Sequence, residues 1–183
     1  MLDSERNAVL QQLADSEAEL LALTAELTPG QWHFRERADR WSIADNLEHV
    51  TVLETFLLAA ITRVLQESPA PEKRAGAASK EALAQGVGTS RDVPLPAREA
   101  ALPTGRWPAG DELRAQFRAA RARTVAFAAS TDADLRAHFF PHVTFGDLDC
   151  YQWLIVMGQH GSRHARQIEQ VMADQGFPKG GAR

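Results

Sequence analysis

The sequence contains very little cysteine: Cys150 is the only one in 183 residues, which excludes an internal disulfide and any zinc site built from several cysteines. Long apolar runs are also absent, since no window approaches the roughly 18 consecutive apolar residues of a membrane helix. The formal net charge of −4 gives no bulk attraction to nucleic acid or to acidic membranes, so we expect neither as a partner. The polar start, Met1-Leu2-Asp3-Ser4-Glu5-Arg6, lacks the apolar core of a signal peptide, and the default expectation is a soluble cytoplasmic protein.

The length predicts one domain over residues 1–183. A chain of this size buries roughly 70% of its unfolded surface without disulfide or metal staples. Apolar residues at helical spacing, bounded by capping and stop signals, predict an all-α fold with four long helices. These helices are expected over residues of about 4–27, 43–67, 109–129 and 147–175. The stretch Ser42–Asp45 is an acidic variant of the capping box, and Trp41 before it is expected to pack back onto the first turns of the second helix. Asp147 is expected to cap the fourth helix.

Two connections separate the predicted helices. Residues 69–108 are rich in Gly, Pro, Ser and Ala, and their prolines forbid a long helix, although Ser79–Gln85 can form a short one. We interpret 69–108 as a long loop insertion that crosses the bundle between the second and third helices. The second connection, 130–146, is broken by Pro141.

Two further patterns concern the third and fourth helices. Arg114, Arg118 and Arg121 form a basic stripe, for which a solvated face is a better interpretation than an anion site. Gly158 and Gly161 are locally costly inside a helix, by about 1 kcal/mol each relative to alanine. Close approach of another helix or of a ligand would explain them, and chance occurrence is the alternative.

Three histidines are the candidate functional residues. His160 and His164 are four residues apart on the fourth helix, so their side chains share one face, and that face is otherwise apolar. His49 lies beside the apolar stripe of the second helix. Neutral core histidines bonded to the backbone are one interpretation, but each ring must then satisfy two nitrogens. A divalent metal such as Zn, Ni, Fe or Cu satisfies one nitrogen per ring, and three ligands leave an open coordination position.

His138 and His142 have the same spacing as the main pair. Pro141 lies between them and disfavours a shared helical face. We therefore expect surface or rim histidines and not metal ligands.

Two segments carry a resemblance to a known family. Trp41-Ser42-Ile43-Ala44-Asp45-Asn46-Leu47-Glu48-His49-Val50 resembles the W-S…H-[LV] signature of the DinB/YfiT-like superfamily, and His160-Gly161-Ser162-Arg163-His164-Ala165-Arg166-Gln167-Ile168 resembles its C-terminal motif. The resemblance implies an up-down-down-up four-helix bundle and a divalent metal held by His49, His160 and His164. It also implies a homodimer. Characterised relatives include bacillithiol S-transferases and a mycothiol-dependent isomerase.

The leading hypothesis is an enzyme that activates a low-molecular-weight thiol at the metal for transfer to an electrophile, with Asn46 and Gln167 as polar pocket groups. A metal-dependent hydrolase is an alternative, with Glu48 or Glu169 as a candidate base. A non-catalytic metal-binding stress or interaction module is another, and a fourth protein ligand would favour it. Cys150 lies ten residues before His160, roughly 15 Å along the helix, and is too distant to be a ligand.

Overall fold

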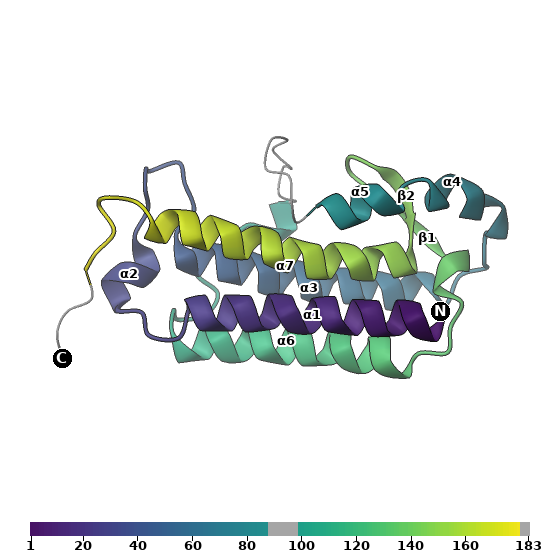
Figure 1. Ribbon diagram of the computed structural model, residues 1–183, viewed down its shortest axis with the longest axis horizontal. Helices are drawn as coiled ribbons and strands as arrows, with labels where there is room; N and C mark the ends of the chain where they lie inside the picture. Colours follow the sequence, from purple (N-terminus) through teal and green to yellow (C-terminus); the bar gives the residue numbers. More distant parts are fainter. Residues whose placement is uncertain (88–98, 180–183) are drawn as a thin grey trace.

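The computed structural model describes residues 1–87 and 99–179, and four long helices form its bundle (Figure 1). α1 and α7 run in one direction and α3 and α6 in the other, so the predicted up-down-down-up bundle is confirmed. α1 and α3 each pack against both α6 and α7. The bounds of the long helices are Asp3–Leu23 for α1, Ile43–Val64 for α3, Asp111–Ser130 for α6 and Cys150–Met172 for α7.

Shorter elements occupy the connections. They are the helices α2 (Pro29–His33), α4 (Arg74–Ala78) and α5 (Glu81–Gly86), and the 3₁₀ turns η1 (Pro71–Lys73), η2 (Glu99–Ala101) and η3 (Leu135–Ala137). α5 overlaps the short helix predicted within 69–108, and the stretch 88–98 of that predicted loop lies outside the described residues.

A two-stranded hairpin in the second connection was not predicted. β1 (Phe139–His142) pairs antiparallel with β2 (Gly146–Asp149), and Phe140 stands opposite Leu148. Gly146 has φ of +67°, a conformation that side chains with a Cβ rarely adopt, so glycine suits the start of β2. The connection broken by Pro141 is therefore an ordered corner of the fold next to the start of α7.

Local capping explains where two of the long helices begin. At α3 the predicted box is present: Ser42 Oγ accepts the Asp45 backbone N–H at 3.2 Å, and Asp45 Oδ2 accepts the Ser42 N–H at 2.8 Å. The predicted cap of the fourth helix at Asp147 is wrong. Asp149 caps α7 and accepts the Gln152 backbone N–H at 2.7 Å, because pairing in β2 keeps the chain extended through Asp149.

The two glycines of α7 lie where α1 approaches closely. A Cβ at Gly158 would be 2.8 Å from Gln12 Cγ, and one at Gly161 would be 3.0 Å from the buried Ser16 side chain. The expected close approach is therefore that of a neighbouring helix. Within the described ranges, none of the helices has the length and apolar character that crossing a membrane requires.

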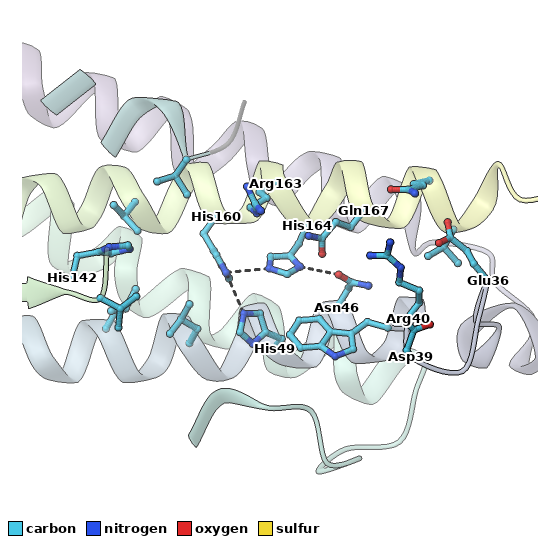
Figure 2. A pocket seen from close by; sticks show the side chains of 18 of the residues that line it. Glu36, Asp39, Arg40, Asn46, His49, His142, His160, Arg163, His164 and Gln167 are labelled. Carbon is cyan, nitrogen blue, oxygen red and sulfur yellow. Dashed lines mark hydrogen bonds between the residues drawn. The ribbon is translucent and has the colours of Figure 1, made fainter. Parts of the chain in front are cut away.

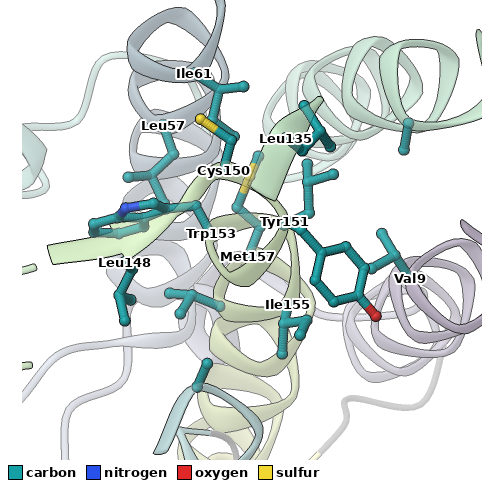
Figure 3. Packing of buried hydrophobic residues seen from close by; sticks show 14 of the residues in the cluster. Val9, Leu57, Ile61, Leu135, Leu148, Cys150, Tyr151, Trp153, Ile155 and Met157 are labelled. Atoms are coloured by element: carbon teal, nitrogen blue, oxygen red, sulfur yellow. The ribbon is translucent and has the colours of Figure 1, made fainter. Parts of the chain in front are cut away.

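Two apolar clusters fill the bundle. One lies at the end where α7 begins and includes Leu57, Trp153 and Met157 (Figure 3). The other includes Leu47 and Ile168. On α7 the segment between the two clusters carries His160 and His164, and His49 lies on α3 among residues of the second cluster. The candidate site is found here.

A buried polar layer, made of Ser16, Glu54 and Arg121, lies between the clusters. The Arg121 guanidinium donates to both carboxylate oxygens of Glu54, at 2.7 Å from Nε and 2.9 Å from Nη2. Its Nη1 donates to Ser16 Oγ at 2.7 Å and to the Leu13 carbonyl. The predicted solvated face holds for the exposed Arg118 but is wrong for Arg121, because Glu54 supplies a buried counter-ion from α3.

Arg121→Met should lower the free energy of unfolding by about 3–5 kcal/mol, because it leaves the Glu54 carboxylate buried without a counter-ion. The double variant Arg121→Met/Glu54→Leu should recover most of this loss, since two apolar side chains then replace the pair. Denaturant unfolding followed by circular dichroism measures both. A double variant no more stable than the single one would contradict this account.

Candidate metal centre

Three histidines from two helices converge in the bundle (Figure 2). His49 lies on α3, and His160 and His164 lie one turn apart on α7. His160 Nε2 is 3.2 Å from His49 Nε2 and 3.0 Å from His164 Nε2. The structure thus brings together the three residues that the sequence singled out, each offering a ring nitrogen within 4.8 Å of the others.

Hydrogen bonds at the outer ring nitrogens set the tautomers of two of these histidines. His49 Nδ1 is 2.7 Å from the Ala101 carbonyl oxygen, which only accepts, so Nδ1 carries the proton. Asn46 donates through Nδ2 to the Ser42 carbonyl at 2.8 Å, which directs its Oδ1 to His164 Nδ1, also at 2.8 Å. His164 is therefore protonated at Nδ1 as well. Both rings turn an Nε2 lone pair toward His160.

This arrangement of nitrogens fits a bound cation. A neutral His160 carries at most one Nε2–H, which cannot point along two directions at once. One divalent cation accepts lone pairs from all three rings. Nitrogens at about 2.1 Å from a tetrahedral zinc lie about 3.4 Å apart, close to the 3.2 and 3.0 Å separations seen here.

The surroundings of the rings favour the neutral form that ligation requires. Burial lowers the pKa of His49 below its ordinary value, and its bond to the Ala101 carbonyl opposes this only in part. Loss of hydration, together with the nearby His49 and the guanidinium of Arg163, lowers the pKa of His160 well below its ordinary value. Both rings are therefore uncharged at neutral pH, and their lone pairs are available to a metal.

Glu48 orients His49 indirectly, through the chain segment that the ring contacts. Its buried carboxylate accepts the backbone N–H groups of Thr104 at 2.8 Å, Gly105 at 2.9 Å and Arg106 at 3.2 Å. It also pairs with the Arg106 guanidinium at 3.1 Å. Glu48 therefore anchors this segment, and its bonds there leave it poorly placed to act as the general base of a hydrolase.

A cavity of about 360 Å³ lies against the cluster. Trp41 forms part of its wall, with its ring centroid 4.7 Å from that of His49 and 5.9 Å from that of His164. Asn46 and Gln167, the predicted polar pocket groups, both line it. The tryptophan was predicted to pack onto the first turns of its helix, and its contact with the ligand rings is the part that sequence reasoning missed.

The remaining sequence candidates lie outside the cluster. His138 Nδ1 is 3.1 Å from the Val64 carbonyl. His142 lines the cavity at some distance from the three rings (Figure 2). Its ring is stacked on that of Phe145, with 4.4 Å between the ring centroids. Glu169 is exposed on α7. As predicted, His138 and His142 lie apart from the three candidate metal ligands. The position of His142 in the cavity wall was not predicted, because it depends on the hairpin.

The fold and this histidine arrangement define a class of helical bundle with a metal-type site. Residues 12–168 match the DinB superfamily, and the chain belongs to that superfamily. Searches of curated proteins and of solved structures gave no match.

Glu48→Ala should reduce the affinity for zinc about 10–100-fold, as is typical when a group that orients a ligand is lost. The reason is that the segment bonded to His49 Nδ1 loses its anchor. Titration of metal-free protein with zinc, with elemental analysis of the product, measures this effect. Glu169→Ala removes the same charge from an exposed position and is the control; equal affinities of the two variants would contradict the orienting role.

Proposed function

We propose that this protein is a metal-dependent enzyme that transfers a low-molecular-weight thiol to an electrophilic substrate. The observation that carries the proposal is the composition of the cluster. In the described part of the chain, three imidazoles make up the metal-type group, with no fourth His, Cys, Asp or Glu in it, and they lie beside a cavity. Three ligands leave a coordination position for an outside group. Zn, Ni and Fe all suit this donor set.

The chemistry follows from the open position and the cavity. A divalent cation held by His49, His160 and His164 would lower the pKa of a thiol bound to it, so that the thiolate forms at neutral pH. Asn46 and the Ala101 carbonyl hold the rings in orientation. In the transfer, the thiol sulfur would form the new S–C bond with its lone pair while the bond from that carbon to the leaving group breaks. The leaving group takes the electron pair of the broken bond, and the thiol proton passes to solvent.

The thiol must come from outside the chain. Cys150 is fully buried in the apolar cluster at the start of α7 (Figure 3), and burial raises the pKa of its thiol to about 12. It remains protonated at neutral pH and is roughly 15 Å from His160 along the helix. An internal nucleophile is therefore disfavoured on both charge and distance.

The two alternative functions have less support. Hydrolysis would benefit from a carboxylate base next to the cluster, but Glu48 is bonded to the backbone of 104–106 and Glu169 is exposed. A purely structural metal would be expected to have a fourth protein ligand. The described residues place no such ligand with the three histidines.

Cys150→Ala should leave conjugation activity within about twofold of the starting protein, because the thiol is neither ionised nor near the cluster. His160→Ala should abolish both stoichiometric metal binding and conjugation while helical circular dichroism is retained. The measurement supplies metal-loaded protein with a panel of cellular thiols and a chromogenic electrophile. Loss of activity in Cys150→Ala with metal retained would contradict the external-thiol proposal.

The proposal includes a homodimer, which the family resemblance implies, and a cytoplasmic location, which is the default expectation from the sequence. Sedimentation velocity at about 50 µM, far above the Kd of a stable dimer, is expected to show a dimer. A single monomeric species at that concentration would count against it.

A further inference from the structure

The cavity extends along the bundle on both sides of the three histidines. α3 and α7 run antiparallel, so residues after His49 on α3 lie at the same end as residues before His160 on α7. Lining residues are found in both directions, from Trp153 to Val171 on α7. At 1.5 Å per residue this is a length of roughly 25 Å, with the cluster between the ends.

One end of the cavity is apolar. Its apolar lining residues, here called the apolar arm, are Leu53, Leu57, Val87, Val143, Trp153 and Val156. Trp153 has the only polar side-chain atom among them, and its Nε1–H already donates to the Phe140 carbonyl at 3.1 Å. One polar side chain, His142, also lines this end, with its ring centroid 5.3 Å from that of Trp153. The apolar arm therefore offers hydrophobic contact and a ring face, and His142 is the polar side chain beside it.

The other end of the cavity is polar and charged. Its polar lining residues, here called the polar arm, are Glu36, Asp39, Arg40, Gln167 and Gln170, and the buried Val171 also lines this end. Figure 2 shows Glu36, Asp39 and Arg40 together beyond His164, on the side away from His142. Asp39 pairs with Arg37 at 2.9 Å, whereas the described residues provide no ion-pair partner for the Arg40 guanidinium. Arg40 is exposed, so this end is open to solvent.

We propose that these arms are two substrate subsites on either side of the reacting position. The polar arm binds a zwitterionic thiol of peptide size, and the apolar arm binds an aromatic or aliphatic electrophile. This inference rests on the proposed function and adds the chemical class of each substrate.

The charges of the polar arm define the thiol. Arg40 matches a carboxylate, Glu36 matches an ammonium group, and the Gln167 and Gln170 amides match peptide groups. Gln170 lies six residues beyond His164, roughly 9 Å along the helix. A thiol with its sulfur at the cluster must span this distance, which corresponds to two or three residues at about 3.5 Å each.

The apolar arm defines the electrophile. A substrate whose reactive carbon faces the cluster places its remaining surface against Leu53, Val156 and the Trp153 ring. Burying an aromatic ring there removes apolar surface from water, at about 25 cal/mol per Å². A small polar electrophile gains little from these apolar side chains, so the apolar arm favours apolar electrophiles.

Two substitutions test the two arms independently. Leu53→Asn makes the apolar arm polar at nearly constant size, and Leu58→Asn is its control, because Leu58 is an equally half-buried leucine of α3 outside this cavity. Arg40→Gln removes the charge of the polar arm. Arg118→Gln removes the same charge from the exposed face of α6 and is its control.

Equilibrium binding to zinc-loaded protein tests the arms without requiring turnover. The probes are S-methylglutathione, whose sulfur cannot become a thiolate, and 1,3-dinitrobenzene, which has no leaving group. In titration calorimetry, Arg40→Gln should lower the affinity for S-methylglutathione about fivefold and leave the affinity for dinitrobenzene unchanged. Leu53→Asn should lower the affinity for dinitrobenzene about tenfold and leave the affinity for S-methylglutathione unchanged. Failure of either probe to bind, or equal effects of both substitutions on one probe, would overturn the proposal.

Turnover then distinguishes this inference from the proposed function. With glutathione and 1-chloro-2,4-dinitrobenzene, the S–C bond replaces the C–Cl bond, and chloride and a proton are released. Arg40→Gln should raise the KM for glutathione but not for cysteamine, which has no carboxylate, and Leu53→Asn should raise only the KM for the electrophile. If conjugation is intact but both substitutions change the two KM values alike, the subsite inference is overturned and the proposed transferase function is not. Selective binding without any conjugation overturns the transferase and supports the subsites.

Discussion

The site depends on one constraint: three imidazole rings can face a single point only if each directs a lone pair there. A neutral histidine ring can carry its proton on either nitrogen, so the inward nitrogen has a lone pair only if the outer nitrogen holds the proton. The Ala101 carbonyl and the Asn46 amide each hold a proton on Nδ1, and this leaves the inward Nε2 of His49 and His164 bare. The inward geometry is therefore a consequence of two hydrogen bonds on the far sides of the rings.

The bundle tolerates this polar centre because it is flanked by two apolar clusters and braced by an ion pair. Arg121 and Glu54 are both buried, and the guanidinium also reaches Ser16 on a third helix. A pair of this kind adds little net stability, but it has one good arrangement, which specifies how the helices align. The small Gly161 beside it allows α1 and α7 to approach at that level.

Much of the helical framework and the three histidines could be predicted from sequence, because helical spacing and the Ser42–Asp45 capping box are local signals. The parts that could not be predicted depend on distant partners. Arg121 is buried because Glu54 lies opposite, although the pattern of α6 alone indicates a solvated face. Likewise, Asp149 replaces Asp147 as the cap because of strand pairing. Glu48 binds residues 104–106, which are more than fifty positions away in the chain.

The adjacency of Glu48 and His49 links two equilibria. Glu48 on α3 binds the chain segment 104–106, and the neighbouring His49 contributes a ring nitrogen to the histidine cluster. Docking of residues 101–106 and binding of a metal to the cluster would therefore favour each other. Whatever binds the docked form stabilises it by mass action, and the linkage is reciprocal. Hydrogen exchange at the Thr104, Gly105 and Arg106 amides, which donate to Glu48, would then report on metal binding at the cluster from atoms outside it.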